Sequence, residues 1–325
     1  MSITLALAGD TMLGRDVAKR LAAVSWHDLF ATAVRDRFAA ADLAVLNLEC
    51  CISARGRPWS SPGKMFHFRA PPKAADLLAL LGVDCVTLAN NHALDYGHEA
   101  FLDTLEHLEN AGIAVVGAGP DEPSARAGTI LEAHGVKVGV LGLTDHPAEF
   151  AAGPDRPGVA YADLSSGVPG WVKERIAALR ARADVVLVTP HWGPNMVAEP
   201  LPYVRRAAVE LLEAGATMIA GHSAHVFQGV SGPILYDLGD FIDDYAVDAD
   251  LRNDLGLLWL VELDERGPRQ VTAVPLALDY CRTRIASENE RALIYDRLAA
   301  ASAEFGTPVE EHDGVFTMHM AVPAH

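Results

Sequence analysis

The chain has 325 residues, half of them hydrophobic, and a formal net charge of −17 at pH 7. This length and apolar content suit one large α/β domain, whereas the strong acidity argues against binding a nucleic-acid backbone, which requires a basic surface. No apolar run approaches the roughly 20 residues of a membrane helix, and residues 1–10 lack the basic and apolar regions of a signal peptide, so we expect a cytoplasmic protein with no membrane insertion.

Strand-like apolar runs alternate with amphipathic stretches through most of the chain, which predicts sheets covered by helices. Helices are expected over residues 27–39, 73–81, 98–111, 171–182, 203–214 and 287–305. Two hairpins are expected, one over 130–143 and one over 255–278. After the last helix, residues 307–325 are expected to form an irregular tail.

Six of the apolar runs end in side chains that bind metals or catalyse reactions. They are residues 3–8, before Asp10; 43–46, before Asn47 and Glu49; 83–89, before Asn90, Asn91 and His92; 185–188, before His191; 218–220, before His222 and His225; and 234–238, before Asp240. The carboxyl ends of successive strands meet at one edge of an α/β sheet, so these groups are expected to form one site.

Carboxylate, amide and imidazole groups make up the expected metal-binding set. The proposed ligands are Asp10, Glu49, Asn91, His191 and a histidine of the 222–225 cluster, either His222 or His225. Such a mixed nitrogen and oxygen shell suits Zn, Mn, Fe or similar ions. Taken singly, an Asp after a strand is usually a helix cap and a buried His is usually only hydrogen-bonded. Their convergence at successive strand ends favours ligation.

Cysteine supplies none of the proposed ligands. The four cysteines, Cys50, Cys51, Cys85 and Cys281, show no metal or redox spacing and are expected to be buried, reduced thiols.

The segment from Asn90 to Gly97 is the sharpest local motif. His92 follows Asn91 directly, so it can reach over the site without being a ligand, as a general acid or as a donor to a developing oxyanion. Asp95, one helical turn further on, would hold the imidazole in one tautomer. The alternative is an Asx-type turn that caps the helix starting near His98. The loop over residues 55–64, rich in Pro, Ser and Gly, is expected to act as a flap near this site.

These motifs resemble the CapA (poly-γ-glutamate capsule biosynthesis, PGA_cap) family of the calcineurin-like metallophosphoesterase superfamily. The resemblance rests on residues 9–15, 47–49, 68–71, 88–92, Asp95, Gly97, 191–193, 221–222 with His225, and 236–241. It implies a four-layer α/β/β/α sandwich with metals at the strand ends, a metallophosphatase-like domain over residues 1–285, and a C-terminal helix and tail, residues 286–325, that belong to the same domain.

The resemblance also implies a role for each site residue. Asp10 and His225 would bind one metal, Asn91 and His191 a second, and Glu49 would bridge the two. His92 would be the catalytic imidazole. Arg15 would grip an anionic group, because a guanidinium pairs with oxyanions in bidentate geometry.

Three positions depart from the superfamily pattern. Met12 stands where a histidine ligand is expected, Ser223 replaces the first histidine of a His-x-His pair, and Asp240 replaces an asparagine. His222 is left to stand in for Ser223. The site is therefore expected to hold one divalent ion firmly and a second weakly, the ion being Mn, Zn, Fe or Ca.

Three functions remain open from the sequence. The first is a hydrolase that acts through metal-activated water on a phosphoester or on an amide of an acidic peptide or γ-glutamyl chain. The second is a metal-assisted peptide Cα-epimerase of a ribosomal (lasso-type) peptide pathway, with His92 and a histidine of the 222–225 cluster as opposed acid and base. The third is a non-catalytic capsule-assembly protein. The expected partner is an anionic small molecule or peptide, and the oligomeric state is left open.

Overall fold

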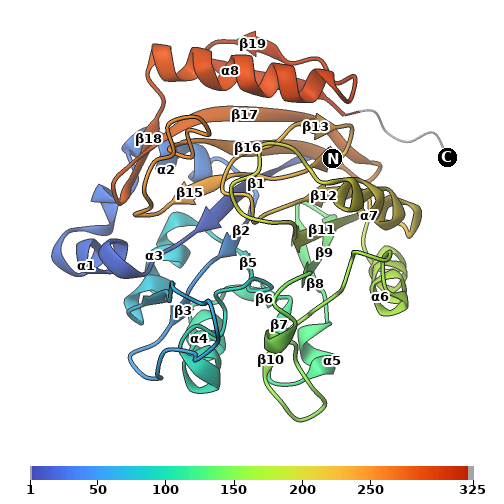
Figure 1. Cartoon of the computed structure of the whole chain (residues 1–325). Helices are drawn as coiled ribbons and strands as arrows, with labels where there is room; N and C mark the ends of the chain where they lie inside the picture. Colours follow the sequence, from blue (N-terminus) through green and yellow to red (C-terminus); the bar gives the residue numbers. More distant parts are fainter. Residues whose placement is uncertain (1, 321–325) are drawn as a thin grey trace.

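Two β-sheets packed face to face form the centre of the molecule (Figure 1). The computed structural model describes residues 2–320. The larger sheet has the order β19-β20-β17-β16-β1-β2-β5-β6, with β15 paired to β1 and β18 to β17. Its strands are β1 (Ser2–Thr11), β2 (Leu43–Leu48), β5 (Cys85–Thr87), β6 (Ala114–Val116), β15 (Asp240–Ile242), β16 (Leu255–Asp264), β17 (Gly267–Asp279), β18 (Arg282–Ile285), β19 (Glu310–His312) and β20 (Val315–His319).

The smaller sheet has the order β13-β14-β12-β11-β9-β8. Its strands are β8 (Thr129–Ala133), β9 (Val136–Thr144), β11 (Val185–His191), β12 (Met218–Ala220), β13 (Val230–Ser231) and β14 (Ile234–Leu235). Two short pairs lie outside both sheets, β3 (Cys51–Ile52) with β4 (Arg69–Ala70) and β7 (Ala118–Gly119) with β10 (Gly158–Val159).

The alternation of side chains along the strands divides the core into three layers. In β1, Leu5 and Leu7 point into the core between the sheets, whereas Ala6 and Ala8 face the helices on the outside, as the two-residue period of a strand requires. In β11, Leu187 lies in the inner core and Val188 in the outer core of the smaller sheet. Both faces of each sheet are therefore buried, which explains the nearly continuous apolar runs of the sequence.

Helices cover the two outer faces, which confirms the expected four-layer α/β/β/α sandwich. On the larger sheet these are α1 (Arg15–Ala23), α2 (Thr32–Ala39), α3 (Lys73–Leu81) and α4 (Gly97–Asn110); on the smaller sheet, α6 (Gly170–Arg180) and α7 (Pro202–Glu213). Figure 1 shows α1, α3 and α4 on one side and α6 and α7 on the other. The chain also forms the short helix α5 (Glu122–Ala125) and the 3₁₀ turns η1 (Trp26–Asp28) and η2 (Ala148–Phe150). No helix of residues 2–320 is both long and apolar enough to span a bilayer.

The expected helix over 27–39 begins late. The chain makes the turn η1, runs extended past Phe30, and becomes helical only at Thr32. The reason is tertiary: Ala31 N donates to the carbonyl of Thr283 and Thr283 N donates to that of Leu29, so this segment pairs like a strand while Phe30 is buried. The preceding helix α1 was not expected from the sequence.

The prediction of an irregular tail from residue 307 is wrong for the residues up to 320 that the structure describes. Residues 310–319 form the hairpin β19–β20, and β20 extends the larger sheet by pairing with β17. Asp313 and Gly314 both have positive φ at its turn, the geometry for which an Asp-Gly pair is favoured. Residues 321–325 lie outside the described residues.

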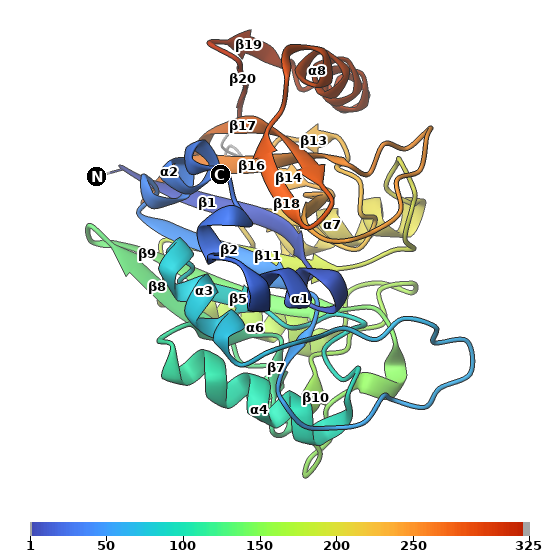
Figure 2. The ribbon, with the colours of Figure 1, turned by 90° about the vertical axis from the view of Figure 1, so that its left-hand side faces the viewer.

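Helix α8 (Glu288–Ala303) lies at one end of the sandwich beside β17 (Figures 1 and 2). Its Ile294 and Leu298 are fully buried in the core between the sheets, and its first turn is closed by a capping box between Ser287 and Glu290. The C-terminal segment thus shares a core with the preceding residues. The boundary at residue 285 between the metallophosphatase-like part and this segment stays a prediction.

Candidate metal centre

The carboxyl ends of strands from both sheets bring together five of the proposed ligands, namely Asp10, Glu49, His191, His222 and His225. Asp10 lies near the end of β1, in register with Asn47 of parallel β2 and with Asp240 of parallel β15. His191 ends β11 and forms an isolated parallel bridge with His222. Strand β15 passes so close to β1 that a Cβ atom on Gly9 would lie 1.7 Å from the carbonyl oxygen of Gly239. This glycine is required because the two backbones meet beside Asp10.

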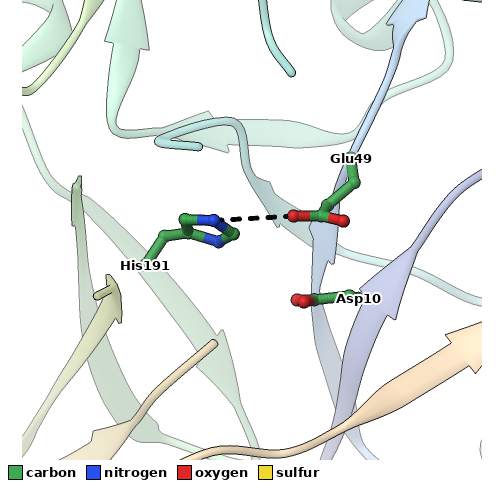
Figure 3. A group of neighbouring side chains, drawn as sticks. All are labelled: Asp10, Glu49 and His191. Carbon is green, nitrogen blue, oxygen red and sulfur yellow. Dashed lines mark ion pairs between the residues drawn. The ribbon is translucent and has the colours of Figure 1, made fainter. Parts of the chain in front are cut away.

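Asp10, Glu49 and His191 form the first group of converging side chains (Figure 3). All three are buried, and one ligand atom from each lies within 4.8 Å of the others. The distance from His191 Nε2 to Glu49 Oε1 is 3.6 Å. Asn47 Nδ2 donates to Asp10 Oδ1 over 2.7 Å and lies 3.4 Å from His191 Nδ1, so its amide orients two members of the group from behind.

Asp10 also belongs to a second group, with His225 and Asp240. His225 Nδ1 lies 2.9 Å from Asp240 Oδ1 and 3.3 Å from Asp10 Oδ2. His222 Nδ1 lies 3.2 Å from the other oxygen of Asp10. The resemblance implied Glu49 as the bridging carboxylate, whereas the carboxylate that the two groups share is Asp10.

The turn from His222 to His225 has strained backbone. Ser223 has a φ of 111° and His225 a φ of 58°, in the left-handed region that costs non-glycine residues free energy and is enriched at functional sites. Ser223 N points toward Asp10 Oδ2 at 3.3 Å and Ala224 N donates to Asp237 Oδ2. These contacts place both histidines next to Asp10.

Several buried polar atoms of the cluster have no hydrogen-bond partner among residues 2–320. They are both carboxylate oxygens of Glu49, Asn91 Oδ1, His191 Nε2, His222 Nδ1 and Asp240 Oδ2. A buried polar atom without a partner costs about 1–3 kcal/mol, so such a concentration is unfavourable unless something else binds these atoms. All six can act as acceptors or lone-pair donors, which is the chemistry of a cation site.

The protonation equilibria of the cluster reflect its burial and its internal pairs. Burial lowers the pKa of His191 far below its usual value, more than the charge of Asp10 raises it, so the ring is neutral, as ligation requires. Burial and then the charge of Asp10 raise the pKa of Glu49 well above normal. Burial opposes ionisation of Asp10, but the adjacent imidazoles of His222 and His225 hold its pKa well below normal.

The imidazole of His92 is fixed through its Nδ1 by Asp95, and the residue lines a cavity beside the cluster. Its Nδ1 is 2.7 Å from Asp95 Oδ2, so Nε2 is the ring nitrogen left for the cavity. The ring of Phe68 packs against the imidazole, tilted by 30°, with the ring centroids 4.1 Å apart. Asn90 makes the Asx-type turn considered from the sequence, with its Oδ1 accepting from His92 N. It does not cap α4, which begins at Gly97 without a side-chain cap.

Two cavities flank the cluster. The first, of about 330 Å³, is lined by His92, His225, Arg15, Asn195 and a group of apolar side chains that includes Phe66, Phe68, Met196 and Tyr245. The second, of about 570 Å³, is lined by Asn91, Asp145, His146, Tyr203 and again Asn195. Arg15 is paired with Asp244 through Nε at 3.2 Å, and its side chain is 37% exposed, so it lies at the rim of the first cavity and not in the cluster.

The three departures have clear positions. Met12 is fully buried in the outer core of the larger sheet, where its sulfur accepts from Gly14 N. Ser223 donates its hydroxyl to the carbonyl of Gly193, and Asp240 joins the second group as described.

Sequence reasoning named Asn47 at the end of an apolar run without giving it a role, and it did not single out Lys64. Asn47 lies near the carboxyl end of β2, beside the proposed ligands, and this position was a usable signal. Lys64 lies in an irregular loop with no such pattern.

The fold and this cluster together define an α/β/β/α sandwich with a candidate cation site at its strand ends. The chain belongs to the bacterial capsule synthesis protein PGA_cap family, whose model matches residues 4–245; this confirms the resemblance. It is 31% identical over 292 residues to a "probable polyglutamine synthesis accessory protein" of Mycobacterium tuberculosis, covering 83% of this chain and 75% of that protein.

The chain is also similar to a second curated relative and, more distantly, to solved structures. The chain is 29% identical over 248 residues to the PGA biosynthesis protein CapA of Bacillus subtilis, covering 74% of this chain and 63% of that protein. Among solved structures, the NAD nucleotidase of Haemophilus influenzae is 13% identical with a TM-score of 0.46, covering 92% of this chain and 63% of that chain. This chain therefore spans less than two thirds of these last two proteins, and the structural likeness is too low to assign an activity. None of these similarities supports the peptide epimerase alternative.

Proposed function

We propose that this protein is a metal-dependent hydrolase of the CapA type that cleaves a phosphoester or an amide of an acidic peptide or γ-glutamyl chain. The observation that supports this most directly is the set of buried acceptor atoms without partners around Asp10. A scaffold would gain nothing from this arrangement, because each such atom destabilises the fold unless a ligand binds it.

The residues that would hold one or two divalent ions are, in this proposal, Asp10, Glu49, Asn91, His191, His222 and His225, with Asp240 added by the geometry. A bound cation supplies a Lewis acid and lowers the pKa of water enough to provide hydroxide near neutral pH. The donors are oxygen and imidazole nitrogen throughout, which suits Mn, Zn or Fe better than a thiolate-preferring ion.

His92 would transfer the proton in this reaction. Because Asp95 holds Nδ1, the proton is exchanged at Nε2, on the side of the cavity. Protonating the leaving group is a role for an imidazole within reach of the reacting bond. Arg15 would bind an anionic part of the substrate at the cavity rim, where Phe66 and Phe68 lie about 5.7 Å from its guanidinium carbon and restrict its orientation.

The names of the relatives bear on the choice of substrate. CapA of Bacillus subtilis is described as a PGA biosynthesis protein and the mycobacterial relative as a polyglutamine synthesis accessory protein. A glutamyl chain carries the repeated amides and carboxylates that the proposed site would accept, so an acidic amide and a phosphoester should be tested side by side.

Metal content and hydrolysis should be measured on the same preparation. Elemental analysis counts ions per chain, and p-nitrophenyl phosphate, bis(p-nitrophenyl) phosphate and poly-γ-glutamate test the two bond types. We expect at least one divalent ion per chain and cleavage of one substrate class that chelation abolishes and metal restores. A chain that binds metal but cleaves none of them, or cleaves them equally well after chelation, would overturn the proposal. Deuterium entering a peptide α-carbon without cleavage would point to the epimerase.

A further inference from the structure

Lys64 reaches from a surface loop into the turn that carries His92. The loop joins β3 to β4 and was expected to be a flap. The side chain of Lys64 is only 14% exposed, and its ammonium lies 2.6 Å from Asp95 Oδ1. The same ammonium donates to the carbonyl oxygen of Asn91 over 2.9 Å. One lysine thus contacts both ends of the segment from Asn91 to Asp95.

The carboxylate of Asp95 depends on this lysine. It is fully buried, and its Oδ2 is already used by His92 Nδ1 at 2.7 Å and by Phe68 N at 2.6 Å. Its Oδ1 has no aligned hydrogen bond among the described residues, so the contact with Lys64 is an ion pair. Removing one partner of a buried pair leaves an uncompensated charge, which is strongly unfavourable.

Other contacts join the loop to the same turn. Trp59 N donates to the Asp95 carbonyl over 2.8 Å, and within the loop His67 Nε2 lies 2.9 Å from the carbonyl of the same Trp59. At the end of the loop, Phe68 N donates to Asp95 and the Phe68 ring packs against that of His92. The same contacts therefore fix both the position of the loop and the orientation of the imidazole. Among them, the contact made by Lys64 is the ion pair.

We propose that Lys64 is a positioning residue that holds Asp95 in the rotamer that orients His92, and so couples the seating of the loop over residues 53–68 to the direction of the imidazole. Lys64 does not touch the reacting atoms; it acts through Asp95. With Oδ1 held by Lys64, Oδ2 is directed at Nδ1 of His92, and Nε2 is presented to the cavity. The catalytic consequence of this arrangement rests on the proposed hydrolase function, whereas the positioning itself does not.

The test compares three full-length variants. Lys64→Met removes the charge and both contacts, Lys64→Arg restores a cation, and Lys173→Met removes a lysine from a surface pair with Glu210 as the matched control. The first readout is the imidazole ¹⁵N spectrum of histidine-labelled protein, with the His92 signals assigned by their loss in His92→Asn and recorded with Zn²⁺ and with EDTA. If Lys64→Met does not fold, as judged by circular dichroism, Lys64→Gln takes its place.

We expect wild type and Lys173→Met to show a single Nδ1-protonated tautomer for His92. Lys64→Met should show a mixture of tautomers, and Lys64→Arg should return toward wild type. Unchanged His92 signals in a folded Lys64→Met or Lys64→Gln protein would overturn the proposal, whether or not the protein hydrolyses anything.

Activity provides the second readout if the wild type cleaves a substrate. Loss of a residue that orients a catalytic group typically costs about ten- to a hundredfold, and we expect a fall of that size in kcat with metal content and KM nearly unchanged. An equal fall in Lys173→Met, or no rescue by Lys64→Arg, would count against a specific role. An inactive wild type with a Lys64-dependent His92 spectrum would refute the proposed function and leave the positioning intact.

Discussion

The carboxylate of Glu49 lies 3.6 Å from Nε2 of His191, although Glu49 follows a strand of the larger sheet and His191 ends a strand of the smaller one. Both side chains are completely buried, and neither of these facing atoms has a hydrogen-bond partner within residues 2–320. The pair therefore joins the two sheets at the candidate site, where unpartnered acceptor atoms from both sheets face each other and could bind a cation.

Replacing Glu49 with Gln should weaken metal binding by more than about tenfold. Losing a residue that only supports a ligand already lowers metal affinity by about tenfold or more, and the loss of a direct ligand should cost more than that. The change preserves the shape of the side chain but removes its charge. Equilibrium dialysis with Mn²⁺ or Zn²⁺ measures the effect. Glu265→Gln, in the exposed turn between β16 and β17, is the control and should bind like wild type. Equal affinity of Glu49→Gln and wild type would exclude Glu49 as a ligand.

Replacing His92 with Asn should lower kcat by about two to four orders of magnitude, the usual contribution of general acid–base catalysis. Metal content should not change, because His92 is proposed to act beside the ligands. Steady-state kinetics and elemental analysis on the same sample measure both quantities. His134→Asn, at the hairpin turn, removes an exposed histidine paired with Asp42 and should leave both unchanged. Loss of metal from His92→Asn would instead make this residue a ligand.

The Gly9→Ala substitution should destabilise the protein by about 1–3 kcal/mol, the usual cost of overpacking a filled site. A Cβ atom there would overlap the Gly239 carbonyl oxygen, so the strands that carry Asp10 and Asp240 would be forced apart. Urea unfolding gives the change in free energy. Gly170→Ala at the start of α6 meets no atom within 4 Å and should be neutral or stabilising. Equal stability of the two variants would show that β1 and β15 tolerate separation.

The stability contributed by the charge of Glu290 should disappear in acid. The bidentate contact with Arg284 lowers the pKa of Glu290 to about 2, below its ordinary value of about 4.3. A depressed pKa means that the stabilisation is complete above the ordinary value and is lost as the pH falls from about 4.3 toward 2. Glu290→Gln should therefore be less stable than wild type at neutral pH, by about 1 kcal/mol or less for a pair near the surface.

Urea unfolding of wild type and Glu290→Gln at a series of pH values measures this difference. The difference should be constant from about pH 7 to 5 and shrink below about pH 4. Glu288→Gln, in the same first turn of α8, is the control for the helix dipole. A difference that persists undiminished at the lowest pH would show that the amide disturbs packing and not charge.

Local patterns predicted many of the elements well. Helix α3 has the bounds expected from the sequence, 73–81, because its apolar period begins after two prolines and stops at Gly82. The hairpin expected over 130–143 forms as β8–β9, with its turn at His134-Gly135. The late start of α2 and the hairpin β19–β20 were not anticipated, because each depends on pairing with a distant strand, at Thr283 for the first and at β17 for the second.

The sequence by itself determined the kinds of groups in the candidate site and the sheet edge at which they gather, because strand-ending motifs are local and their chemistry is readable from residue type. Only the tertiary structure decided that Asp10 is shared by two groups, that Asn47 supports it, and that Lys64 reaches Asp95. The reason is that these contacts depend on the packing of two sheets and the course of one irregular loop. No periodic pattern encodes the distance between side chains that meet only after the strands are assembled.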